Sequence, residues 1–434
     1  MSKKFQVKTW KASKLPKDWF KRRLPNSKAK EKIENETNAI IEKVIKYGDS
    51  ALMELTKKFD KAIVDPKNLR VTTAEKREAY NAVNGEQVSA IKFMKEKVTS
   101  FEKLALKFAE FTTNKDGVTI QSTIQPIESV GCYVPGGQAA YPSTLVMTTA
   151  PAKVAGVPRV VVCSPPNPEG KVNPLVLVAA DICDVDEIYK VGGAQAIAAL
   201  AYGTERIKPV KKIVGPGNKY VTTAKILVSR NVAIDMPAGP SEVLVLADET
   251  AEARLIASDM ISQAEHSADS VAGLITTSEE CAIEVQSWLS KMAVSADRGE
   301  IVGKAFEKYG FIIICEKMDK AIELANSFAP EHIEILTQDS GKIAEKITSA
   351  GLILLGPHSP VALSDYASGT NHVLPTGGFA NAHSGLSVLD FVRRVSIVRS
   401  TEKGLIAVKK CVKTLTEAEN LPNHYKAFEA RFEK

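Results

Sequence analysis

RVVVCSPPNPEGKVNPLVLVAADICDVDEIYKVGGAQAIAALAYG, residues 159–203, decides the fold class. Two short β-type runs, RVVVCSP and DEIYKVGG, alternate here with two apolar runs of helical character, PLVLVAADIC and AQAIAALAYG. Short apolar strands separated by helices are typical of a parallel sheet that helices cover on both faces. The stretch therefore predicts an α/β fold.

The same alternation continues on both sides of this stretch. Further β-type runs are ESVGCYV, KKIVGPG, EVLVLAD, SVAGLITTS, GFIIICE, HIEILT and GLILLGP, with helical patterns between them. The runs form two α/β units that meet near residues 237–241. Residues 27–111 look helical, with no strong strand before 118, and the charged tail from about 386 also looks helical. We therefore predict two Rossmann-like parallel-sheet lobes with an N-terminal helical arm and a C-terminal helical tail.

Composition and charge narrow the class of protein. The 434 residues are 44% hydrophobic and 25% charged, which excludes a collagen-like, low-complexity or largely disordered chain. The net charge of +6 lies in residues 1–30, which hold eleven Lys and Arg and one acid, whereas the other 404 residues sum to −4. We interpret the basic arm as a solvated or subunit-packing extension. The acidic body and the lack of aromatic–basic interleaving outside the arm argue against a nucleic-acid partner.

The sequence also indicates where in the cell the protein is located. No apolar stretch reaches the ~18 residues of a membrane span, and the basic N-terminus lacks the apolar segment of a secretory signal. An acid-poor transit peptide stays open as the alternative. The six cysteines are scattered without a CxxC pair, which favours reduced thiols. We expect a cytoplasmic protein that has no membrane partner.

Three glycine-rich turns follow β-type runs and open helices: GCYVPGG (131–137), KVGGAQAIA (190–198) and KIVGPGNKY (212–220). Glycine lets backbone N–H groups approach a phosphate, and a helix N-terminus favours anions. In doubly wound sheets ligands bind at the carboxyl ends of the strands, where these turns should lie. None matches the GxGxxG fingerprint. A dinucleotide site and three plain turns therefore both remain open.

The histidines lie in unusual settings. Gln263 and His266 are three residues apart at the end of a helical pattern in SQAEHSADS, so both can reach one metal ion. Asp365 and His372 lie in SDYASGTNHVLPTGG, which looks like a loop after a buried strand. Imidazole and carboxylate are zinc-type ligands, but these spacings match no compact zinc motif. A hydrogen-bonded surface or cap histidine is the alternative at each position.

Glu331 and His332 are adjacent in FAPEHIEIL, at the start of a β-type run. Neighbours on a regular strand point to opposite faces, so both face one cleft only where the backbone is irregular. Pro330 is placed to provide that irregularity. A histidine beside a carboxylate suits proton transfer near neutral pH. The alternative is a glutamate in a surface ion pair.

Together the motifs resemble the histidinol dehydrogenase family, from about residue 27 to the C-terminus. The resemblance rests on the following motifs in this order: YGDSALMELTKKFD, GCYVPGGQAAYPSTLVM, VGGAQAIAALAYGTE, KIVGPGNKYV, AIDMPAGPSEVLVLAD, SDMISQAEHSADS, FAPEHIEIL and SDYASGTNHVLPTGG. It implies a zinc-dependent enzyme that oxidises L-histidinol to L-histidine with two NAD in succession. It also implies a homodimer with shared active sites.

The resemblance assigns the site residues by motif. It implies one zinc per subunit, held by Gln263, His266, Asp365 and His424, the last from the other subunit. Glu331 and His332 resemble the family's acid/base pair, with His332 taking the hydroxyl proton and Glu331 activating water in the second oxidation. The substrate-contacting positions would be Ser241, His372 and Glu419, and the NAD-contacting positions Tyr133, Gln195 and Asn218. The tail departs from the family pattern at Pro422, which starts or bends a helix just before His424.

This reading divides the chain into four segments: a basic N-terminal arm (1–26), a substrate and zinc α/β domain (27–129 plus 241–385), an NAD-binding α/β domain (130–240) and a C-terminal tail contacting the other subunit (386–434). Two alternatives are a related zinc/NAD dehydrogenase of another small alcohol, such as a sulfonated diol, and a metal-free relative. The SDYASGTNHVLPTGG loop argues against the first, and the full set of expected ligands against the second.

Overall fold

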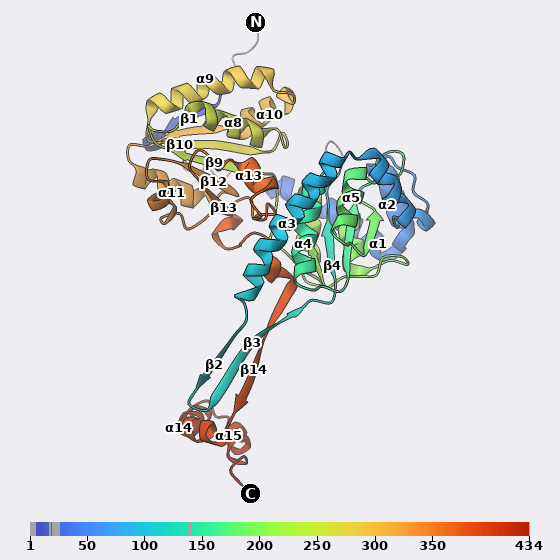
Figure 1. Ribbon diagram of the computed structural model, residues 1–434, viewed down its shortest axis with the longest axis vertical. Helices are drawn as coiled ribbons and strands as arrows, with labels where there is room; N and C mark the ends of the chain where they lie inside the picture. The colour runs from blue at the N-terminus through green and yellow to red at the C-terminus, as the bar shows by residue number, and fades with distance from the viewer. Residues whose placement is uncertain (1–5, 17–18, 20–26, 137–139, 434) are drawn as a thin grey trace.

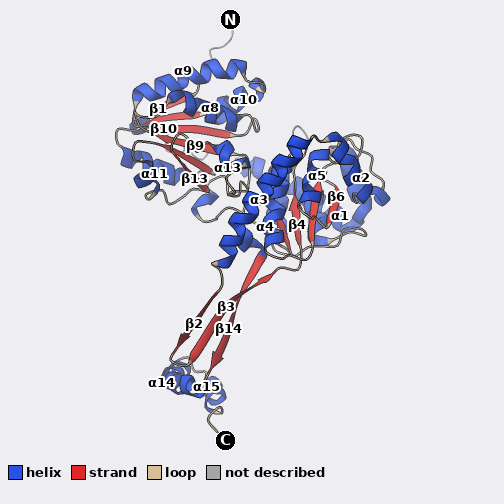
Figure 2. Ribbon diagram, in the orientation of Figure 1, coloured by secondary structure: helices blue, strands red, loops and turns tan. Residues whose placement is uncertain are grey.

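The computed structural model describes residues 6–16, 19, 27–136 and 140–433. Two parallel sheets lie in separate parts of the molecule, and an antiparallel sheet forms a stalk that projects away from them (Figure 1). Helices pack on both faces of each parallel sheet (Figure 2). The expected α/β fold with parallel, helix-covered sheets is therefore confirmed.

The six-stranded sheet has the order β1-β11-β10-β9-β12-β13. Its strands are β1 (Lys8–Lys11), β9 (Glu242–Ala247), β10 (Val271–Thr276), β11 (Phe311–Ile314), β12 (His332–Leu336) and β13 (Leu352–Leu355). Its helices are α8 (Ala253–Ala264), α9 (Glu279–Ser295), α10 (Gly299–Tyr309), α11 (Met318–Phe328), α12 (Ser340–Ala344) and α13 (Val361–Tyr366). Val243 and Val245 face the core under α8 to α10, whereas Leu244 and Leu246 face the core under α11. Apolar residues on both faces explain the continuous hydrophobic runs of these strands.

The described part of the N-terminal arm packs on its own chain, which differs from the expected solvated or subunit-packing extension. Residues 8–11 form β1, which pairs in parallel with β11 at the edge of the six-stranded sheet. Val7 is buried, and Trp19 stacks on Phe328 inside the core. The backbone groups of an edge strand attract another strand whatever its side-chain charge. Because the KTWK segment is short and mostly exposed, it has no hydrophobic pattern from which a strand could be predicted.

The five-stranded sheet has the order β6-β5-β4-β7-β8, and all neighbouring strands are parallel. Its strands are β4 (Val130–Tyr133), β5 (Val160–Ser164), β6 (Glu187–Lys190), β7 (Lys212–Val214) and β8 (Ala233–Ile234). The helices that connect them are α4 (Pro142–Val154), α5 (Pro174–Ile182), α6 (Gly193–Tyr202) and α7 (Lys219–Val228). The strands and helices of residues 159–203 thus alternate as expected.

The helices before residue 118 pack on this five-stranded sheet. They are α1 (Ser27–Phe59), α2 (Thr73–Ala79) and α3 (Gly85–Lys107). Val44 and Leu52 of α1 share a core with α6 and α7, and Met94 of α3 shares the opposite core with α4 and α5. This packing differs from the expected grouping of 27–129 with 241–385, because a helix's apolar face does not reveal which sheet it covers. The domain boundaries themselves stay a prediction.

The stalk consists of β2 (Phe111–Lys115), β3 (Val118–Pro126) and β14 (Val392–Ser400), and its far end carries α14 (Glu402–Ala418) and α15 (Pro422–Glu429) (Figure 1). β14 pairs antiparallel with the whole of β3. The expectation of an entirely helical tail is therefore wrong for residues 392–400. Their exposed arginines obscured the β-type alternation, and the partner strand lies far earlier in the chain.

Short 3₁₀ helices complete the fold: η1 (Ala12–Lys14), η3 (Pro66–Asn68), η4 (Tyr80–Ala82), η5 (Phe379–Asn381) and η6 (Val388–Phe391). The cysteines are free thiols, and all but Cys411 are buried. Among the described residues, none of the helices is both long enough and apolar enough to cross a membrane.

Candidate active site

The residues expected to contact the cofactor lie at or just after the carboxyl ends of three strands of the five-stranded sheet, β4, β6 and β7. Tyr133 ends β4, Gln195 lies in the first turn of α6 after β6, and Asn218 caps α7 after β7. The Tyr133 hydroxyl accepts a hydrogen bond from Gly193 N at 3.1 Å, and burial raises the pKa of that hydroxyl. Gln195 is only 1% exposed, yet neither its amide nitrogen nor its oxygen has a hydrogen-bond partner among the described residues. A buried amide without a partner points to a ligand.

A cavity of about 720 Å³ joins these three residues to helix α1. This volume lies within the range of small-molecule and cofactor pockets. The sequence reasoning did not predict that α1 lines this cavity. The YGDSALMELTKKFD motif nevertheless ends at Asp60, which follows α1 directly and also lines the cavity. Burial raises the pKa of Asp60 to about 6, and its Oδ2 has no hydrogen-bond partner in the described structure.

A buried ion pair holds the turn after β7 in place. Lys225 on α7 pairs with Asp235, and both side chains are almost completely buried. The Lys225 ammonium also donates to the carbonyl of Gly215 at 2.8 Å, while the Asp235 carboxylate accepts from Gly215 N at 2.7 Å. Gly215 has a positive φ, and a Cβ there would lie 2.3 Å from the carbonyl oxygen of Tyr133. Only glycine therefore fits between the ion pair and β4.

A second group of expected site residues gathers around the start of β12. His332 is the first residue of this strand, and Ala329, just before Pro330, adopts a left-handed conformation. This irregular backbone brings His332 Nδ1 to 3.7 Å from Glu331 Oε2, with both side chains buried. His332 Nε2 lies 3.9 Å from Asp365 Oδ1 and has no hydrogen-bond partner among the described residues. Glu331 and His332 thus do face one space, as irregular backbone at Pro330 would allow.

The backbone of Glu242 fixes this pair. Glu331 Oε2 accepts from Glu242 N at 2.7 Å, and His332 Nδ1 lies 3.3 Å from the Glu242 carbonyl oxygen. Burial lowers the pKa of His332, but the carboxylates of Glu331 and Asp365 raise it more, so that it reaches about 9. The imidazole is thus held between an acceptor on β9 and two carboxylates.

His372 links this group to the five-stranded sheet. Its Nδ1 lies 3.1 Å from the Asp365 carbonyl oxygen, and its Nε2 lies 3.4 Å from the Thr144 hydroxyl of α4. The neighbouring Asn371 donates to the Met147 carbonyl of the same helix at 2.8 Å. Burial lowers the pKa of His372, which favours the neutral imidazole. Asp365 itself lies in α13, not in the expected loop, because SDY closes a short helix.

Gln263 and His266 lie at the end of α8, and Ser241 lies just before β9. Gln263 is buried in the last turn of α8, and His266 is half-buried two residues beyond that helix. Because α8 runs back from β9 to β10, its end lies at the amino edge of the sheet. This group therefore lies at the opposite edge of its sheet from the edge at which Tyr133, Gln195 and Asn218 lie in the five-stranded sheet. That these residues bind ligands stays a prediction.

Glu419 and His424 lie in a different part of the molecule from the other expected site residues. Both are exposed in the α14–α15 segment at the end of the stalk, far from the start of β12 (Figure 1). Pro422 begins α15 and places His424 in its first turn. Within the described ranges, no three or more His, Cys, Asp or Glu residues form a group that could hold a metal ion. One chain therefore does not assemble the complete ligand set.

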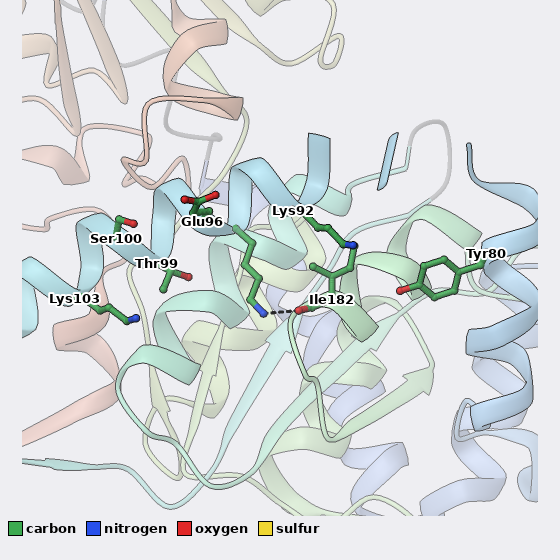
Figure 3. A pocket seen from close by; sticks show the side chains of 8 residues that line it. Tyr80, Lys92, Glu96, Thr99, Ser100, Lys103 and Ile182 are labelled. Atoms are coloured by element: carbon green, nitrogen blue, oxygen red, sulfur yellow. Dashed lines mark hydrogen bonds between the residues drawn. The ribbon is translucent and has the colours of Figure 1, made fainter. Parts of the chain in front are cut away.

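A further hollow of about 520 Å³ lies along α3, near Ile182 at the end of α5 (Figure 3). Lysines of α3 line it, and Lys95 donates to the Ile182 carbonyl at 2.5 Å. It contains none of the residues that the sequence singled out.

Comparison with known proteins gives consistent results. A family model described as histidinol dehydrogenase matches residues 24–432. A histidinol dehydrogenase from Methanocaldococcus jannaschii is 47% identical over 393 residues, which cover 90% of this chain and 91% of that protein. One from Methanosarcina mazei is 44% identical over 396 residues, 91% of each chain.

Solved structures agree with these relatives. The crystal structure of a histidinol dehydrogenase from Elizabethkingia anophelis matches with a TM-score of 0.92 and 36% identity, covering 98% of each chain. An acetylating aldehyde dehydrogenase from Geobacillus thermoglucosidasius has a TM-score of 0.50 at 12% identity, over 86% of this chain and 98% of that chain. The second likeness concerns the fold alone.

Proposed function

Because the chain belongs to the histidinol dehydrogenase family, it is an NAD-dependent oxidoreductase that converts L-histidinol into L-histidine, and we propose which residues perform each part of the reaction. The single observation that carries the proposal is the buried group in which Glu331, His332 and Asp365 meet at the start of β12. The overall change is a four-electron oxidation through histidinaldehyde, with reduction of two NAD.

NAD would occupy the cavity between α1 and the carboxyl ends of β4, β6 and β7. The unpartnered amide of Gln195 supports this position, since a bound ligand would supply its missing hydrogen bonds. Tyr133 and Asn218 line the same cavity. In this proposal the cofactor domain remains residues 130–240, with α1 forming the facing wall.

One zinc per subunit would be held by Gln263, His266 and Asp365 together with His424 of the partner subunit. The residues fit the metal by chemistry, because imidazole nitrogen and carboxylate or amide oxygen are ligands that zinc accepts. When bound, the metal would anchor the imidazole and amine of the substrate and leave the reacting carbon free. Ser241, His372 and Glu419 would complete the contacts to the substrate.

His332 would act as the base in the first oxidation. It would take the hydroxyl proton while the carbinol carbon loses hydride, which leaves the aldehyde. Part of the raised His332 pKa comes from the Asp365 carboxylate. A ligand that engages Asp365 would therefore shift the His332 pKa down, toward the range that a base needs at neutral pH.

Glu331 would act in the second oxidation. Its carboxylate would take a proton from water as the water oxygen adds to the aldehyde carbon, which gives the anion of the hydrate. Loss of the second hydride, to the second NAD, then turns this anion into the carboxylic acid. The side chain lies in the same buried space as His332, so neither the substrate nor the aldehyde needs to leave between the two steps.

A homodimer follows from the same proposal, because His424 and Glu419 lie at the end of the stalk. The stalk exposes large apolar side chains, with Ile397 50% and Val398 63% exposed. Such exposed apolar residues on a projecting sheet support a second subunit that covers them.

The buried free thiols fit a reducing compartment, and we propose a cytoplasmic location.

The stoichiometry of NADH tests the whole proposal. Purified enzyme is given limiting L-histidinol and excess NAD, with and without a chelator. We expect two NADH per histidinol, loss of activity on chelation, and recovery on addition of zinc. One NADH per substrate, or full activity after complete removal of metal, would contradict it.

A further inference from the structure

Glu334 is a buried acid that the reaction does not use. It lies on β12 two residues after His332, and it is 2% exposed. Its Oε1 accepts a hydrogen bond from Val361 N, at the first residue of α13, over 3.0 Å. Its Oε2 is buried and has no conventional donor among the described residues. The carboxyl group of Asp259 on α8 is a hydrogen-bonding neighbour of the Glu334 carboxyl group.

Glu334 is buried and Asp259 is half-buried, and two carboxyl groups in such contact disfavour the state in which both are ionised. Burial and the charge of Asp259 raise the pKa of Glu334 to about 8, and burial raises that of Asp259 as well. A single proton shared between the two groups removes the repulsion and supplies the donor that Oε2 lacks. The pair then satisfies its own hydrogen bonds and leaves Oε1 for the backbone of α13.

The elements that Glu334 connects are those that carry the proposed site. Gln263 follows Asp259 by four residues on α8, so the two share one helix face. Asp365 follows Val361 by four residues on α13, and His332 precedes Glu334 by two residues on the same face of β12. Figure 1 shows α8, β12 and α13 together at the six-stranded sheet.

We propose that Glu334 and Asp259 form a positioning pair that shares one proton and holds α8, β12 and α13 in the arrangement that Gln263, His332 and Asp365 need. The inference rests on the proposed site. Neither acid touches the reacting atoms in this proposal; both act through the elements that they join. Partners of this kind typically change metal affinity by about 10- to 100-fold when they are removed.

The test measures zinc affinity of the full-length enzyme by competition with a chelator, together with kcat and KM for histidinol. In Glu334→Leu the hydrogen bonds to Asp259 and Val361 N are lost, and we expect zinc affinity to fall by about 10- to 100-fold. Glu334→Gln keeps both, since its amide donates to Asp259 and its oxygen accepts from Val361 N. We expect that variant to stay within about threefold of wild type. NAD binding should not change in either variant.

Val361→Pro removes the donor to Glu334 and serves as a second variant should Glu334→Leu misfold. Val361 is the first residue of α13, a position where proline suits a helix. Its side chain is buried in the core, so Val361→Ala, which keeps the N–H donor, is the matched control for lost packing. We expect the zinc affinity of Val361→Pro to fall about tenfold below that of Val361→Ala. Wild-type affinity in both Glu334→Leu and Val361→Pro would overturn the positioning role. Equal impairment of Glu334→Gln and Glu334→Leu would overturn the shared proton.

Gln263→Ala separates this inference from the proposed function. As a direct ligand, Gln263 should lower zinc affinity in the same assay when it is replaced. If Gln263→Ala binds zinc normally, the metal site itself is wrong. If Gln263→Ala is impaired and the Glu334 and Val361 variants are not, only the positioning pair is wrong.

Discussion

His332 and Glu331 differ in their contacts, and this predicts different defects on substitution. His332→Ala should slow the first hydride step by about 10²- to 10⁴-fold, the usual effect of losing a general base. Glu331→Gln keeps an oxygen to accept from Glu242 N and loses only the basic carboxylate. It should complete the first oxidation and accumulate aldehyde. Single-turnover NADH formation, with a trapping amine for the aldehyde, distinguishes the two.

The two variants control for each other because both leave the proposed zinc ligands unchanged. Each should retain zinc and NAD as the wild type does. Should Glu331→Gln lose the first NADH to the same extent as His332→Ala, the two roles would have to be reassigned.

At the residue level, sequence reasoning identified those residues whose role can be recognised from their immediate neighbours in the chain. Glu331 and His332 follow Pro330 directly, and the structure does bring their side chains within 3.7 Å. Glu334 escaped because a polar residue in HIEIL looks like the solvent-facing member of a strand. Its partner Asp259 belongs to a helix far earlier in the chain. Only the tertiary contact between α8 and β12 makes the two acids a pair.

At the scale of elements, α3 and η6 are joined by an acid whose protonation should affect stability. Glu102 of α3 is fully buried, and its Oε2 accepts from Val388 N of η6 at 2.7 Å. Burial raises its pKa from 4.5 to about 7. Between these values the folded protein holds a proton that the unfolded chain has released. The contribution of Glu102 to the free energy of unfolding therefore falls as the pH rises from about 4.5 to about 7, by up to about 3 kcal/mol, and is level above that.

Glu102→Gln should abolish this dependence, because the amide stays neutral and still accepts from Val388 N. Urea unfolding of both proteins at pH 5 and pH 8 measures it. We expect the variant to gain stability relative to wild type on going to pH 8. A wild-type-to-variant difference that is the same at both pH values would contradict the assignment.

Elements differed in how well sequence predicted them. Buried strands such as β9 and β10 were recognised because nearly all of their residues are apolar. In contrast, β1 and β14 form through pairing with β11 and β3, and their own residues are mostly exposed. The position of the end of α8 at the amino edge of β10 also depends on chain direction. The usual rule for doubly wound sheets fits the positions of Tyr133, Gln195 and Asn218, but it does not fit those of Gln263, His266 and His332.

For the whole molecule, the separation of His424 from His332 is the feature that sequence could not supply. The motifs gave both residues and their order, but the stalk that carries His424 away from the body arises from the pairing of β2, β3 and β14. In the proposed function, a complete site therefore requires two chains, each contributing its stalk to the other.

This arrangement predicts complementation between two inactive enzymes. His332→Ala and His424→Ala homodimers should each be nearly inactive. In a heterodimer, purified through different tags on the two chains, one site combines the intact His332 of the second chain with the intact His424 of the first, and the other site carries both defects. The heterodimer should therefore regain about half of the wild-type activity per dimer. A site formed within one chain would leave every site defective, so a heterodimer as inactive as its parents would exclude the shared site. A tagged heterodimer of wild-type and His332→Ala chains, with about half activity in either case, controls for the tags.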